Sequence, residues 1–531
     1  MPIAPIFGFN EAKPDIVRDV VRRVVESVHD FQLTLNDAAY LETKRLAHKK
    51  NHEYQEWRSL AGSLGRMSVA DMRKEVERLA ERYAWDVAGN FDPRVYRVAA
   101  RAMAPVLGTL LSPKNALRNI HRMTGLDALD DRIIVQGPTE QIRGLAEKGT
   151  LIFTPTHLSN LDSVVFGFAL ERAGLPPATY GAGKNLFSNR VLSFFMHNLG
   201  AYRVDRRLRH SLYKDVLKAY SCVLIERGYH SLFFPGGTRS RSGGVERRLK
   251  LGLAGTGVEA FARTAELGRP QRVFFVPATI NYLLTLEAET LIDDFLQEEG
   301  KARYIIEDDE STRFGRVAAF SQKLLGLDAG CVVRFGEPLD CFGNRVDADG
   351  ESHDSRGRRV SAESYVMGAN GKPTRDPKRD AQYTRELGDA ICAAFKRNTV
   401  VMPTHVVATA AFAELQKTLA HTDLFALLSD KDSVRVPRER MESAVATLLE
   451  KLHAAEARSE LVLAPSLHLA RPAKVLSDAL TAFAGYHTHP VLVAGATDLV
   501  LGDTRLIFYY QNRLAAHGFA YDALAPKTKA A

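Results

Sequence analysis

Apolar side chains recur at about every fourth position in two stretches near the start of the chain. In residues 15–29 apolar side chains recur at Ile16, Val20, Val24 and Val28, with Arg and Asp among the residues between them. In residues 69–83 they recur at Met72, Val76, Leu79 and Tyr83. This spacing places the apolar side chains on one face of a helix. We therefore expect residues 1–125 to form a helical N-terminal region.

From about Arg132 onward the pattern changes to short apolar runs. Helical patterns and Gly or Pro residues separate these runs, which are 133–135, 151–153, 231–234, 273–276 and 332–335. Runs of this length between helices fit buried strands. The pattern predicts an α/β fold over residues 126–342, with a mixed or parallel sheet flanked by helices.

Proline follows three of these runs, at Pro155, Pro235 and Pro277. Proline has no N–H group to donate to a sheet, so we expect these strands to end there. In open α/β sheets, ligands bind outside the carboxyl ends of the strands. The segments after these strands are therefore where we expect the chemistry.

Two further regions complete the organisation of the chain. Residues 343–380 are rich in Asp, Arg, Ser and Gly and poor in large apolar residues, which predicts a polar linker or a long loop. Helical patterning of Ala/Leu-rich character resumes after it, so we expect residues 381–531 to form a helical C-terminal region.

Composition narrows the class of protein. Hydrophobic residues at 45% and charged residues at 25% are ordinary values for a globular protein, in a chain of 531 residues. There is no CxxC pair, so neither a disulfide framework nor a cysteine zinc module is expected. We interpret the four cysteines as buried, reduced thiols: Cys222, Cys331, Cys341 and Cys392.

No apolar run reaches the ~18 residues that span a bilayer, and the N-terminus lacks a secretory signal pattern. We expect a soluble protein or one that lies on a membrane surface.

The formal net charge of +8 suits an anionic partner but does not choose among a phosphate, a coenzyme and an anionic bilayer. The basic clusters are short and lack interleaved aromatic residues, so a nucleic-acid partner is not expected.

The first candidate motif is His157 followed five residues later by Asp162, directly after a predicted strand. Histidine acts as a base near neutral pH, and a carboxylate bound to it fixes its orientation. On a straight helix, residues five apart lie about 140° apart around the axis. The pair therefore needs a turn at 158–160 that folds His157 back over a helix beginning near Asn160, with Ser159 or Asn160 as its N-cap.

The second motif runs from Phe234 to Gly243 and follows another predicted strand. Gly236 and Gly237 allow the backbone to approach a ligand closely, and Arg239 and Arg241 offer donor forks suited to phosphate. The third motif is Gly200–Arg206, preceded by the apolar side chains of 187–196, and the fourth is Val276–Tyr282. By itself, each of the last two also fits a core strand and a turn.

Taken in order, the four motifs resemble those of the glycerolipid acyltransferases, over at least residues 133–339. His157 and Asp162 resemble the HxxxxD motif of that family. The likeness is closer to the bacterial and mitochondrial glycerol-3-phosphate acyltransferases. The segments that carry it are 182–186 leading into motif two, 334–339 and 508–513.

One departure from the family pattern is Gly236, which stands where the third motif normally has Glu. In the family that glutamate is implicated in acceptor binding. Its absence predicts a shifted acceptor preference or a weaker activity.

The resemblance implies transfer of a fatty acyl group from acyl-CoA or acyl carrier protein to the sn-1 hydroxyl of glycerol 3-phosphate, giving lysophosphatidate. It implies His157 as the base and Asp162 as its orienting partner, with no metal and no cofactor beyond the thioester co-substrate. The residues that would bind the acceptor phosphate are Arg239, Ser240, Arg241, Lys184 and Arg203. The N–H groups of Gly236 and Gly237 would stabilise an oxyanion or a phosphate.

Three alternatives stay open at this point. The acceptor could be 1-acylglycerol 3-phosphate (lysophosphatidate) or dihydroxyacetone phosphate, and the chain could be a weakly active lipid-binding or scaffold homologue. The apolar run 187–196 fits ordinary core, an acyl channel or a membrane-facing surface, and a cationic cluster follows it at Arg203, Arg206, Arg207 and Arg209. We expect peripheral contact with an anionic membrane, at the cytoplasmic face of the cell membrane.

Overall fold

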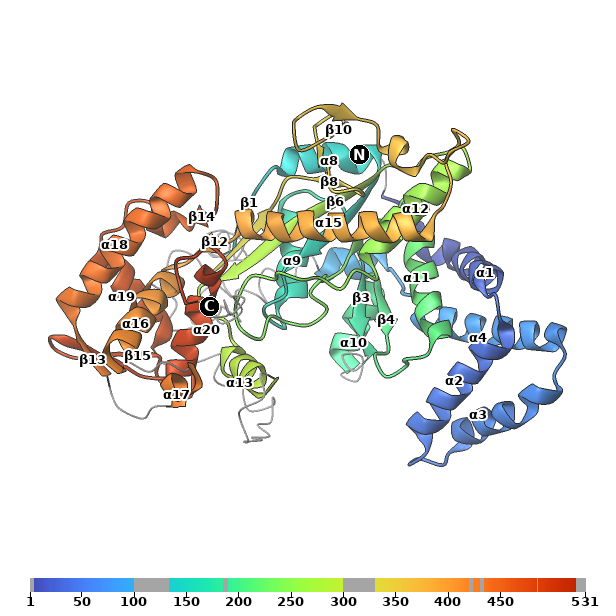
Figure 1. The fold of residues 1–531 in the computed structure, drawn as a ribbon, viewed down its shortest axis with the longest axis horizontal. Coiled ribbons are helices and arrows are strands. Elements are labelled where there is room, and N and C mark those ends of the chain that lie inside the picture. The colour runs from blue at the N-terminus through green and yellow to red at the C-terminus, as the bar shows by residue number, and fades with distance from the viewer. Residues whose placement is uncertain are drawn as a thin grey trace, which may run out of the picture.

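A mixed β-sheet lies at the centre of the molecule, with one group of helices at each end (Figure 1). The computed structural model describes residues 4–99, 133–184, 190–298, 330–419, 424–429, 434–484 and 486–521. The N-terminal helices pack against the β4 side of the sheet through α11 (Ser211–Glu226), and the C-terminal helices occupy the opposite end.

The N-terminal region is helical, as its periodicity predicts. Its helices are α1 (Phe9–Ser27), α2 (Phe31–Leu46), α3 (His52–Ser63) and α4 (Val69–Val87), with 3-10 turns at Pro5–Gly8 and Leu64–Arg66. Helix α4 begins where the Ser68 side chain caps the main-chain N–H of Asp71. The apolar faces of α1 and α4 form one core with α11. The predicted boundary at 125/126 lies outside the described residues.

The predicted α/β sheet is present and is mixed. Its main strands are β1 (Ile133–Gln136), β2 (Thr150–Pro155), β3 (Thr179–Gly183), β4 (Ala201–Val204), β5 (Ser231–Leu232), β6 (Val273–Tyr282) and β7 (Cys331–Phe335). Strands β6, β2, β5, β3 and β4 lie side by side in that order and run parallel. The carboxyl ends of these five strands therefore meet at one edge. The first motif follows β2, the second follows β5, and the third contains β4.

The prediction that proline ends each strand is wrong for β6, which runs through Pro277 to Tyr282. Strand β8 (Leu339–Asp340) pairs with residues 274–275 and β7 pairs with residues 278–282, so Pro277 lies where one partner gives way to the other. The Pro277 carbonyl accepts from Gly336 N on that same side. Because the N and C=O of a strand residue point to one side, the missing N–H faces this junction and breaks no ladder bond.

Residues 343–380 are not a linker or a plain loop, so that prediction is corrected. They form the strands β9 (Arg345–Val346), β10 (Ser352–His353) and β11 (Arg359–Val360), which extend the sheet beyond β8, and the 3-10 turn Ala362–Val366. Asp347 and Asp354 each accept main-chain N–H groups two and four residues on, and Gly350 and Gly357 take positive φ values of 84° and 76°. Aspartate-to-glycine turns therefore build two hairpins from a sequence whose polar composition indicated a linker.

Helices cover the sheet and connect its strands. They are α8 (Thr139–Lys148), α9 (Asp162–Arg172), α10 (Arg190–Asn198), α12 (Ala254–Glu266), α13 (Ala288–Glu298) and α15 (Pro377–Asn398). Helix α12 packs between α11 and α15, and all three cover one face of the sheet. Within the described residues, no helix is both long and apolar enough to cross a membrane.

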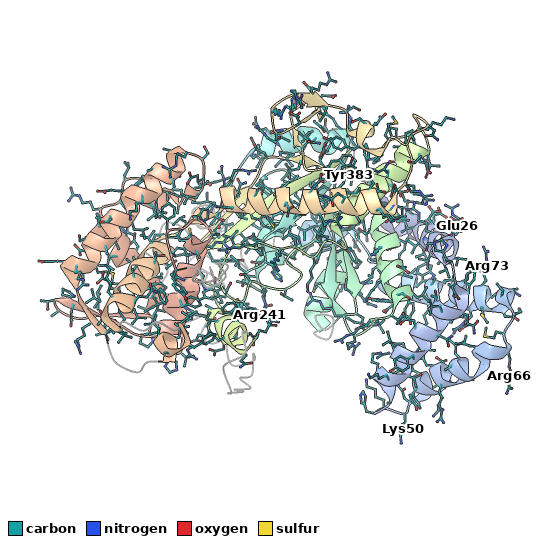
Figure 2. The ribbon with its side chains drawn as sticks, in the orientation of Figure 1. Glu26, Lys50, Arg66, Arg73, Arg241 and Tyr383 are labelled. Atoms are coloured by element: carbon teal, nitrogen blue, oxygen red, sulfur yellow. The ribbon has the colours of Figure 1, made fainter. Side chains whose placement is uncertain are left out.

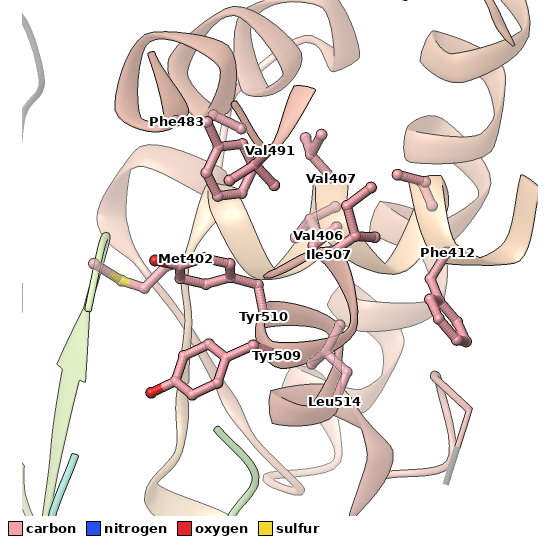
Figure 3. Close-up of a cluster of buried hydrophobic side chains, with 14 of the residues drawn as sticks. Met402, Val406, Val407, Phe412, Phe483, Val491, Ile507, Tyr509, Tyr510 and Leu514 are labelled. Atoms are coloured by element: carbon pink, nitrogen blue, oxygen red, sulfur yellow. The ribbon is translucent and has the colours of Figure 1, made fainter. Parts of the chain in front are cut away.

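The C-terminal region is mainly helical, as predicted, with short strands added. Its helices are α16 (Pro403–Leu419), α17 (Leu424–Ser429), α18 (Arg438–Ala457), α19 (Pro472–Phe483) and α20 (Thr504–Ala515). Its other elements are β12 (Val400–Val401), β13 (Val434–Pro437), β14 (Val462–Leu463), the 3-10 turn Pro465–Leu467, β15 (Leu492–Ala494) and β16 (Asp498–Leu501). Figure 3 shows Val406 and Phe412 of α16 packed with Ile507 and Leu514 of α20 in its core.

All four cysteines are free. Cys222, Cys331 and Cys341 are buried, and burial raises their thiol pKa values well above normal, while Cys392 is half-buried. The interpretation of these residues as reduced thiols in the interior is confirmed for the first three.

Candidate active site

His157 and Asp162 meet at the carboxyl end of β2. His157 lies in the turn after this strand, and its Nδ1 is 2.7 Å from Oδ2 of Asp162, the first residue of α9. The predicted fold-back of the turn is confirmed. The predicted cap is wrong, because the N-cap is Leu161 with no side-chain cap, and the Ser159 hydroxyl donates to Glu287 instead.

The Asp162 carboxylate is fully buried and receives three further hydrogen bonds. Oδ2 accepts from the main-chain N–H of Leu158 at 2.6 Å and of Ser159 at 2.9 Å, and Oδ1 accepts from the Tyr282 hydroxyl at 2.7 Å. Burial raises the pKa of Tyr282 well above normal, so its hydroxyl remains a donor. These donors fix the carboxylate against His157 Nδ1 and leave Nε2 as the ring nitrogen for a substrate proton.

The loop after β5 holds His157 on three sides. The imidazole stacks on the Phe234 ring, with 4.2 Å between ring centroids and 25° between planes. The His157 carbonyl accepts from Ser240 N at 2.7 Å, and its N–H donates to Glu246 Oε1 at 3.1 Å. The His157 side chain is 21% exposed, so the ring is held in place but remains open to a substrate.

Arg239 lies beside the His157 turn, linked to it by Glu287. Glu287 Oε1 accepts from Asn160 N at 2.9 Å and lies 3.7 Å from Arg239 Nη1, while Oε2 accepts from the Ser159 hydroxyl at 2.8 Å. The second motif is thereby brought next to the first. Arg239, which the sequence assigned to the acceptor phosphate, therefore faces the Glu287 carboxylate in the structure.

The neighbours of Arg239 in the second motif are also engaged. Arg241, which lies beside α13 in Figure 2, pairs with Glu298 at the end of that helix. The Ser240 hydroxyl donates to the Gly244 carbonyl at 2.9 Å, and its N–H is the donor to His157. The hydroxyl of Ser240 thus closes its own loop and the N–H holds His157, a role that the sequence did not indicate. Its phosphate role stays a prediction.

Lys184 and Arg203 come together at Asp86 of α4. Lys184 follows β3 and its Nζ is 2.8 Å from Asp86 Oδ2, while Arg203 of β4 has Nη1 3.8 Å from Asp86 Oδ1. Both cations lie at the sheet edge that also carries His157. Their phosphate role stays a prediction, and Asp86 is a partner that the sequence analysis missed.

The Gly236–Gly237 turn differs from its predicted use. The Gly237 N–H donates to the Phe234 carbonyl at 3.0 Å and closes the turn, with Gly237 at a φ of +74°. This N–H is therefore committed to the backbone, which corrects its assignment as an oxyanion or phosphate donor. The Gly236 N–H remains a candidate donor to an oxyanion or a phosphate.

The C-terminal helix α20 reaches the site. Arg513 is 2% exposed and donates from Nη2 to Asn281 Oδ1 at 2.8 Å, and Asn512 donates from Nδ2 to the Ser242 carbonyl at 2.9 Å. Arg513 and Tyr509 line a small cavity together with Leu158 and Tyr282. The sequence marked Arg513 only as part of the segment 508–513 and gave it no place in the site. It missed Glu246 and Glu287, because isolated charged residues outside a motif carry no signal of their position.

Much of the apolar run 187–196, one predicted role of which is an acyl channel, lies outside the residues that the structure describes. Phe187 lies outside the described residues, as do the side chains of Val191, Leu192 and Phe195. Of the remainder, Phe194 is 54% exposed and Met196 is buried against β4. In the part of the chain that the structure describes, no three His, Cys, Asp or Glu residues gather as a metal site would require.

Comparison with known proteins matches residues 132–281 to the Acyltransferase family model. Over 219 residues the chain is 29% identical to the glycerol-3-phosphate acyltransferase of Pseudomonas paraeruginosa, covering 40% of this chain and 24% of that protein. The Pseudomonas fluorescens enzyme of the same name is 26% identical over 51% of this chain and 29% of its own. The chain thus spans about a quarter of the length of these relatives.

Among solved structures, the chain is similar to the 1-acyl-sn-glycerophosphate (LPA) acyltransferase of Thermotoga maritima. The match covers 52% of this chain and 79% of that one, at 13% identity and a TM-score of 0.26, so the fold description rests on the elements given above. The matched family segment runs from β1 through β6 and carries the His157–Asp162 pair and the second motif. Residues 132–281 match the Acyltransferase family model and are an acyltransferase domain, similar to that of the glycerol-3-phosphate acyltransferases named above.

Proposed function

We propose that this protein transfers a fatty acyl group from a thioester to the sn-1 hydroxyl of glycerol 3-phosphate, giving lysophosphatidate. The observation that carries the proposal is the His157–Asp162 pair, with Nδ1 held at 2.7 Å from a buried carboxylate. The names of the relatives support glycerol 3-phosphate as the acceptor. The donor is acyl-CoA or acyl carrier protein.

The reaction needs a base, because an alcohol is a poor nucleophile at neutral pH. His157 Nε2 takes the hydroxyl proton as the acceptor oxygen attacks the thioester carbonyl. The tetrahedral intermediate then collapses, the C–S bond breaks, and the proton passes from His157 to the departing thiolate. Asp162 holds the ring in place and stabilises the imidazolium that forms between these steps. No acyl-enzyme is needed, since the acceptor hydroxyl stands where a serine protease has its own serine.

The acceptor phosphate would bind at Arg239, close to the His157 turn. Arg239 Nη1 lies 3.7 Å from Glu287 Oε1, beyond hydrogen-bond distance, and has no hydrogen-bond partner among the described residues, so it has a donor to offer a phosphate. Arg241, Ser240, Lys184 and Arg203 would support the phosphate from the same edge of the sheet.

We also propose peripheral contact with an anionic membrane through α10 and the loop after β4. The exposed Phe194 lies on α10, and the cationic cluster follows β4. Sedimentation with vesicles tests this: binding to phosphatidylglycerol vesicles, weakened in Phe194→Ser and absent with phosphatidylcholine, is expected. Equal binding to both lipids, or to neither, would contradict it.

A transfer assay with defined substrates tests the reaction. The purified full chain is given radiolabelled acyl-CoA or acyl carrier protein, each with glycerol 3-phosphate, lysophosphatidate or dihydroxyacetone phosphate. We expect the highest kcat/KM with glycerol 3-phosphate. A preference for another acceptor would replace the proposed substrate, and no turnover with any pair would favour the lipid-binding alternative.

A further inference from the structure

The Glu246 carboxylate is placed within the site by a loop that the four motifs do not include. Glu246 follows the second motif by three residues, and its Oε1 accepts the His157 N–H at 3.1 Å. Its Oε2 is enclosed and has no hydrogen-bond partner among the described residues. A buried carboxylate oxygen without a partner is costly, so its placement beside the reactive histidine calls for an explanation other than stability.

Glu246 fills the space in front of Gly236. A β-carbon added at Gly236 would lie 3.4 Å from Glu246 Cγ and 3.6 Å from its Oε1. A glutamate side chain extends roughly 3 to 4 Å from its β-carbon to its carboxylate oxygens. The carboxylate of a glutamate at position 236 therefore has within its reach the place that the Glu246 carboxylate already holds. Gly236 does not have a positive φ, so its backbone accepts a side chain.

A buried cation from the C-terminal region acts on this carboxylate. The pKa of Glu246 is raised, because burial outweighs the hydrogen bond from His157 and the charge of Arg513, both of which lower it. Arg513 has Nε and Nη1 without hydrogen-bond partners in the described structure. The Glu246 carboxylate thus accepts the His157 N–H and lies in the field of a guanidinium from α20.

We propose that Glu246 is a positioning residue that holds the His157 main chain for acyl transfer, and that it does so from the space a glutamate at position 236 would occupy. In this proposal the carboxylate is supplied from ten positions further along the chain, next to Gly236 in space. The inference rests on the proposed function. It also explains why residue 236 is glycine and not glutamate, because a second carboxylate there would meet Glu246.

Relocation of the carboxylate provides the test. Glu246→Ala should lower kcat about 100-fold with little change in either KM, because a small misplacement of a reacting group costs this much. Glu246→Gln keeps an oxygen acceptor for the His157 N–H and should recover most of the rate. Glu246→Ala combined with Gly236→Glu should recover at least tenfold over Glu246→Ala alone. Gly236→Glu by itself should lower kcat, since two carboxylates then share one space.

Glu147→Ala, an exposed carboxylate on α8, is the matched control and should be unchanged. Wild-type kcat in Glu246→Ala would overturn the inference. So would a rate in the double variant that stays at the level of Glu246→Ala. If Glu246→Ala does not fold, the double variant is compared with Glu246→Gln, and a double variant that also fails to fold or to turn over counts against the inference.

A second measurement separates this inference from the proposed function. Amide hydrogen exchange at the His157 N–H should be about tenfold faster in Glu246→Ala than in wild type and slow again in the double variant. If the wild-type chain has no transfer activity with any acceptor, the proposed function fails while this readout still decides the positioning role. Equal exchange in all three proteins would overturn it.

Discussion

The Tyr282 hydroxyl donates a hydrogen bond of 2.7 Å to Oδ1 of Asp162, a residue 120 positions earlier in the chain. This contact joins the end of β6 to the start of α9. It fills the one carboxylate oxygen that His157 and the two main-chain donors leave open. The fourth motif therefore acts on the first by fixing the carboxylate that orients the histidine.

Removal of the proposed base should abolish transfer. His157→Ala loses the group that accepts the hydroxyl proton, and kcat should fall by about 10²- to 10⁴-fold, as is typical for loss of a general base. The circular dichroism spectrum and Tm should stay near those of wild type, since the His157 side chain is partly exposed. His489→Ala, an exposed histidine, serves as control. Unchanged turnover in folded His157→Ala would refute the assignment.

Tyr282→Phe should affect both stability and rate. The variant leaves Asp162 Oδ1 buried without its hydroxyl donor, at a cost of about 1.5–3 kcal/mol for a hydrogen bond to a charged group. Urea unfolding should reveal this loss, and kcat should fall while both KM values stay within about twofold. The exposed Tyr40 gives the control variant Tyr40→Phe. A Tyr282→Phe protein with the wild-type urea midpoint and kcat would contradict the role of this contact.

Arg239→Ala should weaken acceptor binding selectively. If Arg239 holds the acceptor phosphate, the KM for glycerol 3-phosphate should rise at least tenfold, because a charge-assisted bond of about 1.5–3 kcal/mol is lost, while the KM for the acyl donor changes little. Steady-state kinetics with each substrate varied in turn measures both values. Arg248→Ala removes an exposed arginine from the same part of the chain and should change neither. Equal rises in the two KM values would remove the phosphate role.

The protein should lose stability in weak acid through two buried histidines. Burial lowers the pKa of His230 from 6.5 to about 4, and that of His210 likewise to about 4. Both rings accept main-chain N–H bonds through Nδ1, so the folded state requires them neutral. The contribution of these two neutral histidines to the free energy of unfolding is complete above pH 6.5. It is lost progressively as the pH falls from about 6.5 to about 4, by roughly 3 kcal/mol for each histidine.

Urea midpoints measured from pH 7.5 down to pH 4.5 test this. In His210→Asn the side chain can still cap α11, but one titrating group is gone, so its curve should be flatter than that of wild type. A wild-type midpoint independent of pH, or identical slopes in the two proteins, would contradict the expectation.

Local patterns predicted the elements of this protein well where a single period dominated. The spacing of Val20 and Val24 anticipated α1, and the short apolar runs anticipated β1, β2 and β7. The prediction failed at Pro277, because β6 changes its neighbouring strand there from β8 to β7 and the missing N–H breaks no ladder bond. It also failed between Asp347 and Gly357, because aspartate-to-glycine turns form hairpins in a sequence of polar composition.

By itself, the sequence determined the order of the motifs, the need for a turn between His157 and Asp162, and the chemistry these residue types can perform. These depend on residue identity and on near neighbours along the chain. The tertiary structure alone decided that Tyr282 completes the Asp162 site, that Glu287 faces Arg239, and that Glu246 occupies the space in front of Gly236. The physical reason is that a buried charge finds its partners across the fold, where parallel strand ends and α20 converge, and no spacing along the chain encodes such distances.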